Sequence, residues 1–289
     1  MSRSATQAAT LPARRDSLDR TELFGGATVQ HGHDSDRAYL VKPGPDAAAD
    51  VALLERLAAD HGYSKLFAKT VGAATPTFER AGFHAEARIP SGRSGSELAF
   101  CSRFLTAERE HERFPEEVRR ALEPHTRRAG APSDETSGAQ PLSALDATEL
   151  AALYHAVFES YPFPIDDPAF LLEAMVEGTV FVGVRDGSGT LVAAASAEIS
   201  EQTLTCEMTD FATRPENRGA GMAGVLLTGL EAEVAHQGIR VAYTIARATS
   251  MSMNSVFARS GYTYAGTLVN NTHIAGRIES MNVWFRRLG

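Results

Sequence analysis

The sequence lacks the features that mark membrane, secreted and metal-binding proteins. No apolar run approaches the roughly 18 residues that a membrane-spanning helix needs, and the N-terminus has no apolar centre of the kind found in signal peptides. Cys101 and Cys206 lie in separate apolar runs without CxxC spacing, which predicts buried, reduced thiols rather than a disulfide framework or a zinc site. These absences favour a cytoplasmic protein without a membrane partner or a bound metal.

Basic charge is also scarce. With 28 lysines and arginines against 36 aspartates and glutamates, the formal net charge is -8. No basic cluster offers the phosphate contacts that a nucleic-acid partner needs, whereas the acidic balance is compatible with a cationic small substrate. Hydrophobic residues make up 43% of the 289 residues, which predicts a buried core for one large domain or two ordinary ones.

Composition divides the chain into four segments. Residues 1–22 are polar without periodicity and predict a flexible tail. Residues 125–141 are rich in Gly, Pro, Ser and charge and predict a linker. Two regions with periodic apolar patterns remain, 23–124 and 142–289. We therefore expect an N-terminal and a C-terminal domain.

The C-terminal region has the pattern of an α/β (α+β) domain with a mixed sheet. Ser143 fits an N-cap, and apolar residues at helical spacing continue to about Tyr161. Two hairpins follow, the first through the turn DGSG, and the second leads into the strand LTCEMTDFAT. The later elements are a helix that ends before Gly238, a buried strand RVAYTIA, a helix over 253–260 and two last strands.

The N-terminal region repeats the later part of this order. The matching stretches are KLFAK, FERAGF, EARIP and FCSRFL in the first region and AYTIAR, FARSGY, AGTLV and MNVWFRRL in the second. Phe78 precedes Gly82 by the same spacing that separates Phe257 from Gly261. Such helix ends also recur for structural reasons alone, because glycine is the usual residue that ends a helix.

The stretch RGAGMAG, residues 218–224, has no counterpart in the N-terminal region, which reads KPGPDAAA at the same point. Small residues between a strand and a helix leave backbone N–H groups unpaired at the positive end of the helix dipole, and this arrangement suits a diphosphate. The spacing matches neither GxGxxG nor a loop ending in GK[ST]. Spacing alone leaves open a second interpretation, a small-residue helix start packed closely on a sheet.

Arg218, Gly221 and Ala223 match the RxxGxG/A signature of the GCN5-related N-acetyltransferases (GNAT), and FATRPENRG resembles that family's fourth strand running into its coenzyme A loop. The resemblance implies a GNAT fold with a mixed, centrally splayed sheet, preceded here by a smaller α/β domain that resembles a partial repeat. It also implies acetyl-CoA as co-substrate. The residues that the resemblance assigns to the coenzyme are Phe211, Ala212, Thr213, Arg218, Gly219, Ala220, Gly221, Met222, Ala223, Asn254 and Phe257.

Other stretches resemble family members that act on a small diamino acid. They are YPFPI, CEMTDFAT, YTIARA, GTLVNNT and IESMNVWF, and with N-terminal stretches they extend the resemblance over nearly all of residues 29–289. They imply that the acceptor is β-lysine and that its terminal (ε) amine receives the acetyl group. The alternatives are a GNAT enzyme for another small amine or amino acid and, in a different class, an acyl-CoA-binding sensor without catalysis.

Acetyl transfer to an amine needs a base, because an alkylammonium has a pKa near 10.4. Alternation along the expected strand puts Leu204, Cys206 and Met208 on one face and Glu207, Thr209 and Phe211 on the other. Glu207 therefore points away from the apolar face and resembles the strand-four glutamate that many GNAT enzymes use as base, although a solvated hairpin glutamate would look the same. Strict alternation would put Asp210 on the apolar face. It is therefore either strained there or rotated outward by a β-bulge. Both carboxylates are candidates for proton transfer or for ammonium binding.

The family often takes its general acid from a tyrosine at the position that Phe257 occupies here. The departing thiolate then leaves unaided or is protonated by Ser250, Tyr243 or Tyr262. Unaided departure is feasible because thiols titrate about two units below amines. The phenyl ring is also the one feature that favours the non-catalytic sensor.

An acceptor with one carboxylate and two amines needs ligands for each group. The candidates are Arg247, Asn270 and Asn271 for the carboxylate and Asp210 and Glu279 for the retained ammonium. Tyr161 lies in the loop that overhangs the acceptor in such enzymes. Adjacent asparagines also form turns, and aromatic residues also pack proline loops, so these roles stay open. The oligomeric state is open as well, with a homodimer among the possibilities.

Overall fold

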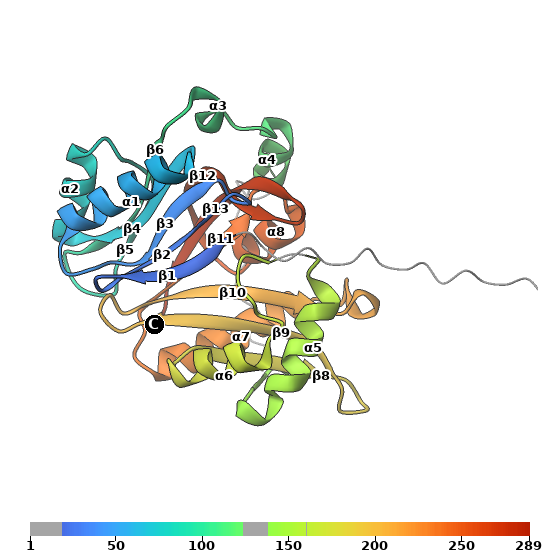
Figure 1. Cartoon of the computed structure of the whole chain (residues 1–289). Helices are drawn as coiled ribbons and strands as arrows, with labels where there is room; N and C mark the ends of the chain where they lie inside the picture. Colours follow the sequence, from blue (N-terminus) through green and yellow to red (C-terminus); the bar gives the residue numbers. More distant parts are fainter. Residues whose placement is uncertain (1–18, 124–137, 160) are drawn as a thin grey trace, which may run out of the picture.

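The computed structural model describes residues 19–123, 138–159 and 161–289 (Figure 1). In these residues the strands form one mixed sheet in the order β1-β2-β3-β4-β6-β5-β12-β13-β11-β10-β9-β8-β7. The elements of its N-terminal half are β1 (Arg20–Phe24), β2 (Ala27–Gly32), β3 (Arg37–Lys42), α1 (Ala47–His61), β4 (Lys65–Val71), α2 (Thr75–Arg80), β5 (His84–Pro90), β6 (Glu97–Phe104), α3 (Ala107–Glu110) and α4 (Pro115–Leu122). Those of the C-terminal half are β7 (Gln140–Pro141), α5 (Ala147–Val157), α6 (Pro168–Val176), β8 (Val180–Arg185), β9 (Leu191–Ser200), β10 (Thr205–Thr213), α7 (Met222–His236), β11 (Val241–Arg247), α8 (Met251–Arg259), β12 (Thr263–Ile274) and β13 (Arg277–Arg287).

The two halves of the sheet have the same topology. In each, three antiparallel strands lead through a helix to a strand parallel to the third, and a second helix leads to an antiparallel hairpin. The order β1-β2-β3-β4-β6-β5 is thus matched by β8-β9-β10-β11-β13-β12, and the halves meet edge to edge at β5 and β12. The mixed α/β sheet is as predicted, while the domain boundaries at 124 and 142 stay a prediction.

The matching helix ends that the sequence displays are also alike in space. Phe78 packs edge to face on Phe83 with ring centroids 5.1 Å apart, and Phe257 does the same on Tyr262 at 5.3 Å. In both pairs the second aromatic residue donates its backbone N–H to the carbonyl of the first. The repeat therefore extends from strand order to the way in which each helix ends.

Helices cover one face of the C-terminal half and part of the other. Leu226 of α7 packs with Trp284 on one face, and Leu150 of α5 packs with Phe181 on the other. The helix α1 covers one face of the N-terminal half. The remaining faces of the two halves pack against each other through Tyr39, Phe67, Phe100, Tyr243, Leu268, Met281 and Val283. Because of this contact, β3 and β4 lie opposite β11.

Ser143 is the predicted N-cap, but it caps a 3₁₀ turn (Ala144–Asp146) that leads into α5, and α5 ends earlier than predicted. The Ser143 hydroxyl accepts the N–H of Leu145 at 3.3 Å, and the Asp146 carboxylate accepts the N–H of Ser143 at 2.8 Å, which forms a capping box. The predicted end near Tyr161 is wrong, because the backbone is already extended at Phe158 (φ -99°, ψ 119°). Prolines that follow closely in YPFP disfavour continued helix.

Two strands lie in segments that the sequence indicated as tail and linker. β1 begins at Arg20, inside 1–22, and β7 occupies Gln140–Pro141, inside 125–141. Both are short edge strands whose stability comes from backbone pairing with β2 and β8, so they carry no strong apolar pattern. Of these two predicted segments, residues 1–18 and 125–137 lie outside the described residues.

Among the described residues, no helix is both long and apolar enough to span a membrane. The same residues contain no group of three or more His, Cys, Asp or Glu side chains placed to hold a metal ion. Cys101 and Cys206 are buried and free, as their apolar surroundings predict.

The joint between the halves depends on a close backbone approach and a buried ion pair. Gly266 of β12 pairs with Ala87 of β5, and a Cβ at Gly266 would lie 2.1 Å from the carbonyl oxygen of Glu86. The Glu86 carboxylate accepts the Lys65 ammonium at 3.0 Å and the N–H of Val269 at 2.7 Å. Burial lowers the pKa of Lys65 to about 8, although Glu86 opposes that shift.

We expect Gly266→Ala to lower the free energy of unfolding by roughly 3 kcal/mol, because the new methyl group would force β5 and β12 apart. Gly187→Ala is the matched control, since a Cβ there meets nothing within 4 Å, and its cost should stay below about 0.5 kcal/mol. Urea unfolding of both variants measures the difference. Equal stability of the two variants would contradict the role assigned to this joint.

Candidate active site

The central feature of the site is the divergence of β10 from β11. The two parallel strands pair only from Thr205 with Val241 to Glu207 with Tyr243. β10 continues to Thr213 but is then paired with β9 alone. Its backbone edge over residues 208–213 is therefore open to an extended ligand that can take up main-chain hydrogen bonds. The predicted splay is present, and the predicted coenzyme residues 211–213 lie along the open edge.

The predicted phosphate loop lies directly beyond this edge. Gly219 and Gly221 have φ values of 84° and 75°, a region that glycine occupies without strain. Gly221 caps α7 without a side-chain hydrogen bond. In the part of the chain that the structure describes, no acceptor is bound to the backbone N–H groups of residues 219–223. Free N–H groups at a helix N-terminus are what a diphosphate needs.

The corresponding helix of the N-terminal half is closed by acidic side chains. The Asp46 carboxylate caps α1 by accepting the N–H of Ala48 at 2.9 Å. Asp50 in the first turn accepts the N–H of Gly44 at 3.0 Å. Two carboxylates at this point would repel an anion.

The two other predicted coenzyme residues are packed inside the protein. Asn254 makes four hydrogen bonds: it donates to the carbonyls of Arg247 and Ser250 and accepts from Asn282 and Trp284, all at 2.8–3.0 Å. This uses the full capacity of its side chain. Phe257 is fully buried, yet it borders the cavity described next.

A cavity of about 280 Å³ lies where the two halves face each other. β3 and β4 form one wall, and β9, β10 and the loop after α5 form the other. The polar and charged side chains on its walls include Arg37, Tyr39, Lys69, Tyr161, Glu198, Glu207, Asp210, Arg247 and Asn271. Most of the predicted acceptor residues are thus brought together, and three residues from the N-terminal half join them.

Glu207 points into this cavity and is held by two donors. Lys69 Nζ and the Tyr243 hydroxyl both bind Glu207 Oε2 at 3.0 Å. Burial would lower the pKa of Lys69, but the Glu207 carboxylate and the nearby tyrosines outweigh it and raise that pKa well above its usual value. Among the described residues no donor is bound to Oε1.

Asp210 is turned into the cavity by a β-bulge. The pairing of β10 with β9 shifts between Thr209 and Ala212, and Asp210 has φ 54°. Its carboxylate accepts the Tyr161 hydroxyl at 2.6 Å and the Ser196 hydroxyl at 2.5 Å. Burial raises the pKa of Asp210, and these hydrogen bonds oppose the increase. Of the two alternatives for this residue, outward rotation by a bulge is therefore the one that the structure has.

The bulge also changes the phase of the strand beyond it. Phe211 packs with the cluster that contains Cys206 and Met208, and its ring lies 5.6 Å from that of Phe257. The prediction that Phe211 shares a face with Glu207 is therefore wrong, because an extra residue in the strand inverts the alternation.

Glu198 is a carboxylate on the cavity wall that sequence reasoning missed. It lies directly opposite Glu207 in the pairing of β9 with β10. No donor or cation among the described residues binds its side chain. The Glu198 residue is exposed on the cavity wall. Partial loss of hydration beside the surrounding protein and the neighbouring Glu207 carboxylate raise the pKa of Glu198 to about 7, whereas Lys69 acts in the other direction.

The predicted carboxylate and ammonium ligands from β11 to β13 are distributed differently. Arg247 borders the cavity but is bound to Glu279 by two hydrogen bonds of 2.9 and 2.7 Å. Glu279 is fully buried and also accepts Arg277 at 2.9 Å, so it lies behind Arg247 and not on the cavity wall. Burial would raise the pKa of Glu279, but both arginines hold it below its usual value.

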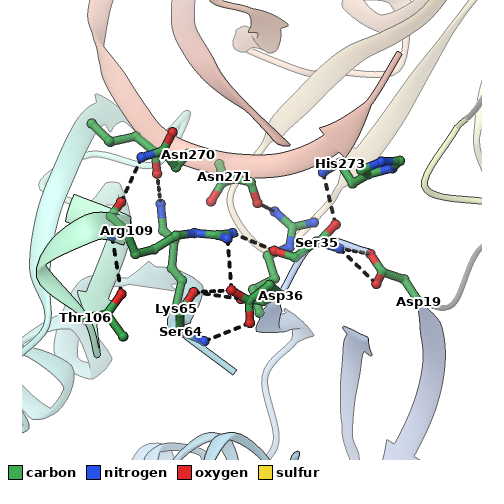
Figure 2. A network of polar contacts seen from close by, with 12 residues as sticks. Asp19, Ser35, Asp36, Ser64, Lys65, Thr106, Arg109, Asn270, Asn271 and His273 are labelled. Carbon is green, nitrogen blue, oxygen red and sulfur yellow. Dashed lines mark hydrogen bonds and ion pairs between the residues drawn. The ribbon is translucent and has the colours of Figure 1, made fainter. Parts of the chain in front are cut away.

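The two adjacent asparagines have different surroundings. Asn270 has φ 44° and donates to the carbonyls of Arg109 and His111 at 2.9 and 2.7 Å, so it ties α3 to β12 (Figure 2). Asn271 borders the cavity instead, and its amide donates to Thr272 at 3.3 Å. The structure therefore brings only the second asparagine to the other candidates.

Arg37 of β3 is a second cavity residue that sequence reasoning missed. Its guanidinium donates to the carbonyl of Asn271 at 2.6 Å, to Thr272 at 2.9 Å and to Gln30 at 2.9 Å, all neutral groups. Burial lowers the pKa of Arg37 to about 10, although Tyr39 and Asp19 oppose that shift. Such residues can be recognised as part of the site only when the packing of the two halves against each other is known.

Comparison with known proteins identifies relatives of this chain. The model described as "Acetyltransferase (GNAT) family" matches residues 148–262. The chain is 35% identical to the β-lysine N(6)-acetyltransferase of Methanococcus maripaludis over 277 residues, 93% of this chain and 99% of the relative. It is 41% identical to the N-acetyltransferase YodP of Bacillus subtilis over 143 residues, 50% of this chain and 52% of the relative.

A solved structure with a similar arrangement is a phosphinothricin acetyltransferase from Sinorhizobium meliloti in complex with acetyl-CoA. The match covers 52% of this chain and 88% of that chain, with 19% identity and a TM-score of 0.46.

Lys69→Met is expected to lower the free energy of unfolding by about 2 kcal/mol, because a largely buried carboxylate loses a charged hydrogen bond. Side-chain exposure of this pair is 17% and 14%. The control, Lys42→Met, breaks the Lys42–Glu177 pair, whose side chains are 65% and 57% exposed, and should cost less than about 1 kcal/mol. Urea unfolding at neutral pH compares them. A cost for Lys69→Met no larger than the control's would contradict the anchoring of Glu207.

Proposed function

Because this chain belongs to the GNAT family of acetyltransferases, we propose that it transfers the acetyl group of acetyl-CoA to the terminal (ε) amine of β-lysine. Family membership rests on 35% identity that extends over 93% of the chain. The relative with that overlap is named for β-lysine. The product of the proposed reaction is N-ε-acetyl-β-lysine.

The charges around the cavity carry the choice of acceptor. Glu207 is balanced by Lys69, whereas neither Glu198 nor Asp210 forms an ion pair with any of the described residues. Arg37 donates only to neutral groups. The cavity thus offers two carboxylates and one guanidinium. β-Lysine at neutral pH carries two ammonium groups and one carboxylate, which is the complementary set of charges.

The residues of the C-terminal half fit the coenzyme. The free N–H groups of residues 219–223 suit its diphosphate, and the open edge of β10 over residues 211–213 suits its pantetheine arm. Acetyl-CoA bound there would supply a thioester carbonyl, to which the amine nitrogen bonds while the carbon–sulfur bond breaks and the thiol leaves. We place one coenzyme in each chain, because Asp46 and Asp50 close the matching helix of the N-terminal half.

Glu207 is the proposed base. It is the last residue of β10 that pairs with β11, so it lies where the strands begin to separate. Lys69 and Tyr243 hold its Oε2, which leaves Oε1 for the amine. The carboxylate takes a proton from the ammonium group, and the neutral nitrogen then attacks. Asp210, fixed by Tyr161 and Ser196, helps to bind the cationic acceptor.

The proton for the departing thiolate has one candidate on the cavity wall. Of the three alternatives to the absent tyrosine, Ser250 borders the cavity. Tyr243 already donates to Glu207, and Tyr262 is buried against Phe257. Departure without an acid also agrees with the low pKa of thiols relative to amines. A cytoplasmic location and a homodimer stay predictions.

The proposed activity is tested by mixing the protein with acetyl-CoA and β-lysine and following the release of free thiol. We expect turnover with a kcat/KM at least about tenfold higher than for α-lysine, since a displaced amine or one methylene changes binding by this order. Similar rates with α-lysine and simple diamines would favour a general small-amine acetyltransferase. Coenzyme binding without turnover of any amine would favour the sensor.

Glu207→Gln is expected to keep acetyl-CoA binding and to lower kcat by roughly 10²-fold or more, the usual scale for a lost general base. Glu201→Gln is the matched control, because Glu201 is exposed in the turn between β9 and β10. Calorimetric binding of coenzyme and the thiol assay give the two quantities. An unchanged kcat in Glu207→Gln would remove this residue from the mechanism.

A further inference from the structure

Two glutamates face each other across β9 and β10 where a folded protein would ordinarily avoid them. Glu198 and Glu207 are direct partners in the antiparallel pairing, so their side chains lie on the same face. Like charges in such a position destabilise a sheet. Lys69 compensates one of them, with Nζ at 3.0 Å from Glu207. The other carboxylate is exposed on the cavity wall and has no hydrogen-bond or ion-pair partner among the described residues, so it is accessible to a cationic ligand.

The strand order places these two carboxylates at different distances from the cleft, which is the gap that opens where β10 leaves β11. Glu207 lies at the point where β10 leaves β11. Glu198 lies on β9, on the far side of β10 from the cleft. Adjacent strands are about 4.8 Å apart, so Glu198 is one strand spacing further away. A ligand group beside Glu207 is therefore one strand spacing from Glu198.

We infer that Glu198 binds the acceptor's second ammonium group, the one that is not acetylated, while Glu207 receives the reacting amine. This inference rests on the proposed function, and it names a specificity residue for the same site. Four carbons separate the two amines of β-lysine, a span of about 6 Å when extended. Cross-strand side chains are about 5 Å apart at Cβ, so the two carboxylates match the two amines.

The other carboxylates near the cavity are less suited to this role. Asp210 is already bound by Tyr161, Ser196 and, at 3.4 Å, Thr209. Glu279 is fully buried behind Arg247. Glu198 retains both oxygens for a ligand. A bound ammonium would also relieve the repulsion between the two glutamates, which contributes to the raised pKa of Glu198.

The test compares two acceptors that differ only in the second amine: β-lysine and 6-aminohexanoate, which keeps the carboxylate and the terminal amine. We expect Glu198→Gln to lower kcat/KM for β-lysine by about 10- to 100-fold, mainly through KM, since a hydrogen bond to a charged group is lost. For 6-aminohexanoate, kcat/KM should change by less than about threefold. The preference for β-lysine should therefore collapse.

Glu201→Gln serves as the control on the same hairpin and should keep the preference for β-lysine. Melting temperatures of both variants report on folding, and Glu198→Asp should recover part of the preference if the charge is what matters. An equal loss with both acceptors would overturn the inference, since it would indicate a base or a structural role. An unchanged preference in Glu198→Gln would also overturn it. If the wild-type protein acetylates neither acceptor, the proposed function fails and this inference fails with it.

Discussion

The separation of β10 from β11 after Glu207 is the constraint on which the site depends. Three consequences follow from this one divergence. It leaves a backbone edge of β10 unpaired, it directs that edge to the glycine loop at the start of α7, and it exposes the last paired residue, Glu207, to the cavity. The bulge beyond Thr209 then turns Asp210 toward the same space. The proposed coenzyme channel and the proposed acceptor cavity thus meet at one point of the sheet.

The two halves of the sheet share a topology but have different roles in the proposed site. Both halves have the same strand order, but α7 begins at glycines with free N–H groups, whereas α1 begins at Asp46 and Asp50. The N-terminal half contributes Lys69 and Arg37 to the wall of the proposed acceptor cavity. Joining the halves at β5 and β12 brings this wall over the C-terminal sheet, and the buried Lys65–Glu86 pair holds the joint.

Much of this arrangement could be predicted from the sequence, and the limits have a physical cause. The glycine loop and the Ser143 cap depend on neighbouring residues, so local pattern was sufficient to find them. Glu207 could be placed by strand alternation, but Phe211 could not, because the bulge changes the phase between them. Local pattern fails wherever register or a distant contact decides.

The missed residues belong to that second class. Lys69 reaches Glu207 across 138 residues of sequence, a contact that depends on how the halves pack. Glu198 becomes informative only through its register with β10, and Glu279 looks available until its pairing with Arg247 is known. Asn270 and Asn271 are adjacent in sequence, yet one ties α3 to the sheet and the other borders the cavity.

The most direct test of the account is a crystal structure of the complex with coenzyme A and β-lysine. The account predicts one coenzyme per chain, with its diphosphate at residues 219–223 and its sulfur at the divergence of β10 from β11. It predicts the terminal amine beside Glu207, the second amine beside Glu198, and the N-terminal half in contact with the acceptor. An acceptor bound away from both glutamates, or a second coenzyme at the start of α1, would contradict it.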